Sequence, residues 1–378
     1  MSKGIPGNLH EHFQGLEDKR RGAGKRHKLI DILTIAICGI ICGADDWSGI
    51  EAYGQAKEEW LKGFLELPHG IPSHDTFGRV FSWLDPKAFE ASFLSWVQEV
   101  MEITKGQVIA VDGKTVRRSH DHANGQEAIH IVSAWAQKNR LVLGQVKVDE
   151  KSNEITAIPG LLRVLDITGC IITTDAMGCQ QEIAATVIEK GGDYILALKE
   201  NQGHLYEDVR ELFAGAIEVS FFDVEHTYAE TANKNHGRIE VRECWAITDP
   251  DFTHYLRGFE NWKGLRSLVK VSCQRQTSTG TSQDDRYFIS SLKTPARQML
   301  QAVRGHWSIE NSLHWVLDIA FREDESRVRK DHAPENLSVL RHIALNLLKQ
   351  DLSKKLGIKN KRLVAAWNND YLIHLFTG

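Results

Sequence analysis

A succession of short apolar runs between residues 107 and 199 constrains the fold of this chain more than any other feature. Strand-like runs and helical periodicity follow the order strand, strand, strand, helix, strand, helix, strand, at residues 108–112, 128–136, 141–148, 155–164, 170–175, 182–190 and 193–199. A polar turn at 137–140 joins the second and third strands. Three antiparallel strands followed by β-α units predict an α/β fold with a mixed five-stranded sheet flanked by helices.

Two of these strand-like runs end in an aspartate. Asp112 follows Val111, and Asp175 follows Thr174. The strand order is that of the ribonuclease H-like arrangement, in which the first and fourth strands are central and adjacent. Both carboxylates are therefore expected at one edge of the sheet. The alternative for either aspartate taken alone is a turn or cap residue.

A third acidic residue, Glu310, lies in a helix-like stretch that begins with Thr294 as a cap and Pro295 in the first turn. Carboxylates suit hard cations such as Mg²⁺, which accept only a few protein ligands. Two such ions about 4 Å apart activate an attacking oxygen and stabilise a leaving one. Asp112, Asp175 and Glu310 are therefore the candidate catalytic residues and metal ligands, with Asp112 shared by both ions.

Two histidines accompany Glu310 at helical spacing. His306 lies four residues before it and His314 four residues after it, so all three share one helix face. They are candidate metal ligands, but no third nitrogen or sulfur ligand accompanies them, and we favour packing or DNA contact. The apolar residues of this helix that are expected to pack against the sheet are Trp307, Leu313 and Leu317.

The patterns divide the chain into five segments. Two hairpin-like pairs of alternating runs, around the turns at 233–237 and 277–280, separate Asp175 from Glu310. The segments are an N-terminal helical domain expected to bind DNA (1–104), the first part of the core (105–205), a β-rich insertion (206–293), the catalytic helix with the helix after it (294–350), and a C-terminal tail (351–378).

The overall composition is that of an ordinary globular protein. The net charge is −4, so nucleic-acid binding would have to come from local patches. One candidate is the run of six cations between Lys19 and Lys28, for which a solvated basic run is the alternative. The six cysteines show no zinc-ligand pairs or disulfide framework, which suits the cytoplasm. The apolar stretch 29–43 is too short to span a bilayer and predicts a core helix, so we expect no membrane association.

Several motifs identify a family. Residues 110–115 (AVDGKT), 174–180 (TDAMGCQ) and 307–315 (WSIENSLHW) resemble the three signatures of DDE transposases from bacterial insertion sequences. Further blocks at 70–77, 198–202 (LKENQ) and 236–240 (HGRIE) also look like this family, and the H repeat-associated subgroup is the most similar. The resemblance covers nearly the whole chain.

The resemblance implies a function. Its members are expected to have a ribonuclease H-like core, to need Mg²⁺ or Mn²⁺ (two ions), and to cut and join DNA at element ends by phosphoryl transfer. Water attacks the phosphodiester at an element end, and the freed 3′-hydroxyl then attacks a target strand. The implied partners are double-stranded DNA, as terminal inverted repeats and target DNA, and a second copy of the chain, as a homodimer in the DNA complex.

The chain departs from related transposases beside the catalytic glutamate. Those proteins carry an arginine four residues before it and a lysine seven residues after it, where this chain has His306 and Leu317. DNA contacts are therefore expected from other side chains near the three acids. The candidates are Lys114, Arg117, Arg118, Lys199, Asn201, Arg304, His306 and Arg322. For the cluster that follows Asp112, a solvated group of charges is the alternative.

Two rival functions remain open at the level of sequence. The first is a catalytically decayed transposase that still binds DNA sequence-specifically, although all three acids are present. The second is a Mg²⁺-dependent phosphohydrolase of small molecules, because strand-end aspartates also occur in such enzymes. Metal-dependent nicking of supercoiled DNA would distinguish an active transposase from the decayed, DNA-binding form. Turnover of a phosphoester in the absence of DNA would identify the small-molecule phosphohydrolase.

Overall fold

The computed structural model describes residues 9–100, 105–121, 125, 127–149, 152–235 and 237–377. The predicted N-terminal domain also contained residues 1–8 and 101–104, and the motif at 236–240 contained His236; these positions lie outside the described residues. No helix within the described ranges is both long and apolar enough to cross a lipid bilayer.

The N-terminal segment is helical, as predicted. Its helices are α1 (Leu9–Phe13), η1 (Gly22–Lys25), α2 (Leu29–Ile41), α3 (Trp47–Ala56), α4 (Glu58–Leu61), α5 (His74–Trp83) and α6 (Pro86–Val100). Side chains cap two of them, because Asp46 accepts a hydrogen bond from the Gly49 N–H and Ser73 accepts one from the Thr76 N–H. Helix α2, the predicted core helix, is buried along almost its whole length.

The predicted succession of strands and helices is present from residue 108 to 198. The elements are β1 (Val108–Thr115), β2 (His130–Ala136), β3 (Leu141–Lys147), α7 (Glu154–Val164), β4 (Ile171–Thr174), α8 (Gln181–Glu189) and β5 (Asp193–Leu198). Strands β1, β2 and β3 are antiparallel, whereas β1 pairs in parallel with β4, and β4 with β5. The first and fourth strands are therefore adjacent, as expected.

The sheet has nine strands, so the prediction of five was wrong. The segment from 203 to 290 contributes α9 (Gly203–Glu218), β6 (His226–Asn235), β7 (Arg238–Ile247), α10 (Pro250–His254), η4 (Phe259–Asn261), β8 (Ser267–Thr277) and β9 (Gly280–Ser290). Strand β9 pairs antiparallel with β5, with Leu196 opposite Ile289, and the order is β3-β2-β1-β4-β5-β9-β8-β7-β6. The insertion covers the free edge of β5, which would otherwise expose unpaired backbone groups.

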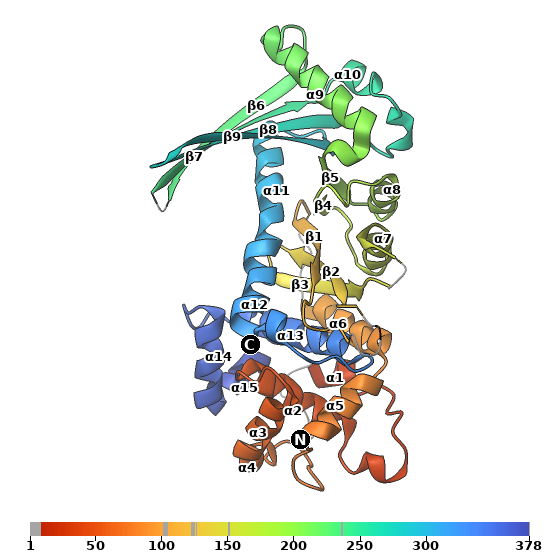
Figure 1. Cartoon of the computed structure of the whole chain (residues 1–378), viewed down its shortest axis with the longest axis vertical. Helices are drawn as coiled ribbons and strands as arrows, with labels where there is room; N and C mark the ends of the chain where they lie inside the picture. Colours follow the sequence, from red (N-terminus) through yellow and green to blue (C-terminus); the bar gives the residue numbers. More distant parts are fainter. Residues whose placement is uncertain are drawn as a thin grey trace.

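One long helical segment runs from the sheet at the top of Figure 1 down to the level of α13 in the middle of the molecule. It consists of α11 (Ala296–Ile309), one π-helical turn (Glu310–His314) and α12 (Trp315–Phe321). Its cap position is Pro295 rather than the predicted Thr294. The short helices η3 (Glu200–Gln202) and η6 (Glu323–Glu325), and then α13 (Ala333–Gln350), α14 (Ile358–Trp367) and α15 (Asn369–Thr377), complete the chain.

The N-terminal helices and the sheet share one hydrophobic core. Helix α13 is the common element, because almost all of its residues are buried and it packs against α2, α5 and α6 as well as β3. The C-terminal tail folds back onto the same region. There the Arg362 guanidinium donates hydrogen bonds to the backbone oxygens of Ile40 and Ala320, near the C-terminal ends of α2 and α12. A cation at two helix C-termini is electrostatically favourable.

The outer edge of the sheet at β3 is closed by one side chain. Asn346, on α13, is fully buried, accepts a hydrogen bond from the Val142 N–H at 2.8 Å and donates one to the Val142 oxygen at 2.9 Å. Its amide therefore acts as the missing neighbouring strand for this residue. The arrangement leaves no buried backbone group of Val142 unpaired on that side.

We predict that Asn346→Leu lowers the free energy of unfolding by about 2–4 kcal/mol, because it leaves a buried N–H and a buried C=O without partners. Urea unfolding followed by circular dichroism measures this loss. Gln350→Ala is the matched control on the same helix, since Gln350 makes an exposed hydrogen bond to the Asn139 oxygen. The control should change the free energy by less than about 1 kcal/mol. Equal losses in both variants would contradict the role of Asn346.

Candidate active site

The pairing of β1 with β4 brings the two aspartates together. Val111 and Thr174 are opposite each other in the parallel register, so the residues that follow them, Asp112 and Asp175, lie at neighbouring positions. Asp112 is still inside β1 and partly buried, whereas Asp175 is exposed in the loop after β4. The expectation that both carboxylates meet at one edge of the sheet agrees with this register.

The π-helical turn brings Glu310 and His314 to the same place. His314 Nδ1 lies 3.1 Å from Glu310 Oε2 and 3.7 Å from Asp112 Oδ2. One ligand atom from each of these three residues lies within 4.8 Å of the others, a spacing that could hold a metal ion. A π turn is rare and often marks a functional site, because it inserts an extra residue and rotates the following side chains.

The charges around Asp112 are mutually repulsive. Burial, and then the carboxylates of Asp175, Glu154 and Glu310, raise the pKa of Asp112 to about 7. Burial also lowers the pKa of His314 and of His306, which favours the neutral imidazole at both positions. His314 Nε2 is buried without a hydrogen-bond partner among the described residues. The cluster therefore holds several acidic groups and a neutral histidine, and no lysine or arginine among the described residues pairs with Asp112.

His306 contacts β4 instead of projecting toward solvent. Its Nδ1 lies 3.2 Å from Thr173 Oγ1, and its neighbours include the Asp175 carboxylate and His314. This position is partly buried between α11 and the sheet. Among metal ligation, packing and DNA contact, the three alternatives for His306, these contacts correspond to packing.

The loop that carries Asp175 is shaped by its neighbours. Asp175 Oδ1 accepts a hydrogen bond from the Gly178 N–H at 3.1 Å, and a Cβ atom on Gly178 would come within 2.5 Å of the Thr174 side chain. Asn201 donates to the Ala176 oxygen at 2.8 Å, and Gln202 donates to the Cys179 oxygen at 2.7 Å. Asn201, which we predicted as a DNA contact, therefore uses its amide to hold the catalytic loop.

Two residues near Asp112 were not identified from the sequence. His130 Nε2 lies 2.5 Å from Glu154 Oε1, and a Cβ atom on Gly113 would approach both atoms to 2.3 Å. Gly113 is thus required beside the catalytic aspartate because this pair occupies the space of a side chain. The signal in the sequence was the glycine directly after Asp112, although it did not indicate which residues would approach it.

Lys114, another predicted DNA contact, is held by protein carboxylates. Its ammonium lies 2.8 Å from Asp318, 2.9 Å from Asp324 and 3.3 Å from the buried Glu323. Glu323 also pairs with buried Arg341. This network joins β1 to the segment that follows the catalytic helix, so Lys114 fixes the position of that segment.

The other predicted DNA contacts are exposed. Arg117 is exposed and pairs with Asp324, and the Arg118 backbone oxygen accepts a hydrogen bond from Arg329. Lys199 and Arg304 are exposed.

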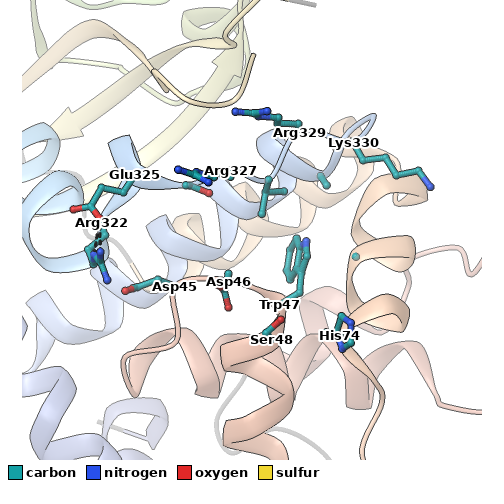
Figure 2. A pocket seen from close by; sticks show the side chains of 14 residues that line it. Asp45, Asp46, Trp47, Ser48, His74, Arg322, Glu325, Arg327, Arg329 and Lys330 are labelled. Atoms are coloured by element: carbon teal, nitrogen blue, oxygen red, sulfur yellow. Dashed lines mark hydrogen bonds and ion pairs between the residues drawn. The ribbon is translucent and has the colours of Figure 1, made fainter. Parts of the chain in front are cut away.

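Arg322 pairs with Glu325 and lines a separate cavity of about 520 Å³ between the α2–α3 loop, α5 and residues 322–333 (Figure 2). In Figure 2, the Trp47 side chain projects into this cavity, whereas the Lys330 side chain points away from it. Asp112, Asp175 and Glu310 are not among the described residues that line it.

The catalytic helix exposes part of the face that we expected to be buried. Leu313 and Leu317 are buried, in agreement with the prediction, but Trp307 is 48% exposed and Trp315 is 58% exposed. The Trp307 ring packs under the guanidinium of Arg286, 5.1 Å from its centroid. Trp307 therefore meets the sheet through Arg286 on β9, while about half of its side chain stays exposed.

The comparisons with known proteins agree with this geometry. The family model described as "Transposase DDE domain" matches residues 103–347, and a model described as "DDE_Tnp_1-associated" matches residues 10–97. The chain therefore belongs to the family of proteins with a transposase DDE domain.

Two relatives match almost the whole chain. "Putative transposase YncI" of Escherichia coli O157:H7 is 43% identical over 97% of this chain and 93% of its own length. "H repeat-associated putative transposase YhhI" of Escherichia coli K12 is 41% identical over 98% of both. Among solved structures, the synaptic complex of piggyBac transposase with hairpin DNA has a TM-score of 0.45 and 10% identity, over 99% of this chain and 77% of that chain. This likeness is too weak to support a statement about the chain.

We predict that Asp112→Asn stabilises the metal-free protein at pH 8. The folded-state pKa of Asp112 is about 7 instead of 3.8, so its ionisation opposes folding as the pH rises above about 4 and does so fully above about 7. The gain in the free energy of unfolding should be up to about 4 kcal/mol at pH 8, from about three pKa units, and should vanish near pH 4.

Denaturant unfolding in EDTA at both pH values measures this effect. Asp251→Asn, at an exposed position, is the control and should change the free energy by less than about 0.5 kcal/mol. An Asp112→Asn protein that is no more stable than the wild type at pH 8 would show that the carboxylates do not repel one another as described.

Proposed function

We propose that this protein is a DNA transposase that cuts and joins DNA at the ends of an insertion sequence, with a ribonuclease H-like core formed by residues 105–205 and 294–350. The observation that carries the proposal is the convergence of Asp112, Glu310 and His314 within 4.8 Å, beside Asp175. Membership in the transposase DDE domain family supports the assignment of these acids. The helical segment 1–104 is proposed to bind DNA beside this core.

The residues fit divalent cations. Asp112 carries a raised pKa because three further carboxylates surround a partly buried group, and a cation at this point would remove that repulsion. Oxygen-rich ligand sets suit Mg²⁺ or Mn²⁺, and the neutral imidazole of His314 is compatible with Mn²⁺. We propose that Asp112, Asp175 and Glu310 hold two such ions, which would activate the attacking oxygen and stabilise the leaving oxygen of the phosphodiester.

The chain's own residues prepare this site. The Gly178 N–H orients the Asp175 carboxylate, and the amides of Asn201 and Gln202 hold the loop that carries it. Lys114 anchors the segment after the catalytic helix to β1, two residues from Asp112. These contacts keep the acids on rigid elements before DNA arrives, which reduces the reorganisation needed for reaction.

Synapsis of two element ends requires two copies of the active site, so we propose a homodimer in the DNA complex. We also propose a cytoplasmic location. The alternative is a catalytically decayed protein that binds DNA. One relative, "Inactive transposase YbfQ" of Escherichia coli K12, is 42% identical over 74 residues of the chain. In this chain all three acids are present and adjacent, which favours the active form.

We predict that the full chain nicks supercoiled plasmid DNA in Mg²⁺ or Mn²⁺ but not in EDTA. Asp112→Asn and Glu310→Gln should each reduce the rate by more than about 100-fold, because even outer-shell partners of a metal contribute 10–100-fold. An agarose gel of nicked and linear forms against time measures the rate. Lys263→Ala is the control, since Lys263 is exposed and pairs with Glu189 on another part of the molecule.

Two outcomes would contradict the proposal. Binding to a labelled duplex without cleavage in either metal would identify the decayed form. Turnover of p-nitrophenyl phosphate that depends on Asp112, without any cleavage of DNA, would identify a small-molecule phosphohydrolase.

A further inference from the structure

The hairpins of the insertion form an arm with an unusual polar cluster. We define the arm as residues 231–235, 237–242 and 272–283, the distal parts of β6–β9, which extend to one side of α11 at the top of Figure 1. Side chains alternate between the faces of a strand, so Arg238, Glu240 and Arg242 project from the same face as Cys244 and Ala246. Cys244 and Ala246 pack in one apolar cluster with residues of α11. The polar cluster therefore continues the face that α11 covers.

Glu240 is the centre of this cluster. It is buried, and its carboxylate lies 3.0 Å from Arg275 Nε, 3.3 Å from Arg238 Nε and 2.5 Å from Arg242 Nη2. Although burial raises the pKa of Glu240, these guanidinium groups lower it on balance, so the carboxylate is ionised. One negative charge thus organises three positive charges, which leaves a net charge of about +2 on a small area.

The donors in this cluster outnumber the acceptors. Arg238 and Arg275 use their Nε atoms on Glu240, and their terminal nitrogens have no acceptor among the described residues, although both side chains are about half exposed. Arg242 Nη1, Thr231 Oγ1 and Asn233 Nδ2 are buried and unpaired in the same part of the chain. Thr231 is directly opposite Arg242, and Asn233 is opposite Glu240, so these groups are neighbours.

A purely structural ion network does not account for this arrangement. A carboxylate has about four acceptor sites, so Glu240 can engage all three guanidinium groups, but it carries only one negative charge. The three positive charges held beside each other therefore repel, which costs free energy unless a further anion joins them. Guanidinium groups whose Nε atoms are fixed present their terminal N–H pairs as a fork, which suits phosphate oxygens.

We propose that Arg238 and Arg275, organised by Glu240, form a seat for the phosphate backbone of duplex DNA. This inference rests on the proposed function, because it supplies the DNA that the catalytic carboxylates would cut. Helix α11 advances about 1.5 Å per residue, so Glu310 lies roughly 16 Å further along its axis than Met299, which packs beneath the sheet. Along β7, Glu240 lies four residues beyond Cys244, which packs against α11, so the seat lies roughly 13 Å out from that contact. Both offsets together are shorter than one helical turn of DNA, ~34 Å, so a duplex held in the seat can reach the carboxylates.

Cations between the seat and the active site support this path. Arg286 on β9 lies over the exposed Trp307 ring of α11, and Arg304 on the same helix is exposed. The surface from the arm to the turn that carries Glu310 thus presents arginines from two elements. The cavity in Figure 2 is a weaker candidate for DNA binding, because the carboxylates of Asp45 and Asp46 line it together with the cations and would repel phosphates.

The test is equilibrium binding of the full chain to a labelled random-sequence duplex of about 40 base pairs in EDTA, across a range of salt concentrations. Backbone contacts carry no sequence information, so a random duplex is a sufficient probe. Arg238→Ala with Arg275→Ala should weaken binding roughly tenfold and reduce the salt slope by about 2, close to 1 for each lost phosphate contact. Arg163→Ala with Lys263→Ala removes two exposed cations elsewhere and should change neither quantity.

Two further variants separate the seat from simple attraction between opposite charges. Arg238→Lys with Arg275→Lys keeps the charge, so the salt slope should stay near that of the wild type while the affinity falls. Glu240→Gln adds a net positive charge, yet it should weaken binding because the guanidinium groups lose their anchor. Tighter binding by Glu240→Gln would overturn the seat. Thermal unfolding of each variant shows whether the arm remains folded.

The remaining outcomes distinguish the two proposals. If the wild type binds and nicks DNA but the double alanine variant binds equally well, the seat is wrong and the transposase function stands. If the double alanine variant loses thermal stability without any change in DNA binding, the cluster is only structural. If the wild type binds no DNA at any salt concentration, both proposals fail.

Discussion

The repulsion among carboxylates around Asp112 is the constraint on which the rest of the structure depends. Parallel pairing of β1 with β4 places two aspartates at adjacent positions, and the π turn adds Glu310 beside them. Burial, together with this crowding, raises the pKa of Asp112 and opposes folding at neutral pH. The surrounding elements must therefore be rigid enough to hold the acids together, and this explains why so many polar contacts converge on the ends of these strands.

That rigidity comes from elements far apart in the sequence. Lys114 and Arg341 converge on buried Glu323, so the segment after the catalytic helix is locked to β1 and to α13. Arg362 joins the ends of α2 and α12 from the C-terminal tail. The N-terminal helices, the catalytic helix and the tail thus form one support beneath the site. A buried ion pair contributes little net stability but is costly to break, which suits a role in fixing geometry.

The sequence predicted the order of strands and helices better than it predicted how the strands of the insertion pair with the core sheet. The order of strands and helices from β1 to β5, the adjacency of Asp112 and Asp175, and the helix with Glu310 were readable from apolar periodicity and family motifs. The nine-stranded sheet was not, because alternation in β6–β9 indicates hairpins but not which free edge they join.

The protein contacts of Lys114 and Asn201 were not readable from the sequence for a related reason. A lysine or an asparagine near an active site looks the same in sequence whether its partner is DNA or the protein itself. Only the fold brings Asp318 and Glu323 to Lys114, or the Ala176 oxygen to Asn201. The His130–Glu154 pair was invisible because nothing in the local sequence links a strand residue to the start of a distant helix.

Because β9 joins the insertion to the core sheet, the insertion is mechanically coupled to the carboxylate cluster. If the hairpins formed a separate domain, a flexible linker would decouple the arm from the catalytic acids. Instead β9 pairs with β5, and only residues 291–295 separate the end of β9 from α11, which continues into the π turn that carries Glu310. A force or a ligand that displaces the arm therefore acts on the same helix that completes the carboxylate cluster. If DNA binds along the arm as proposed, its binding and the positions of the carboxylates are therefore linked through this helical segment.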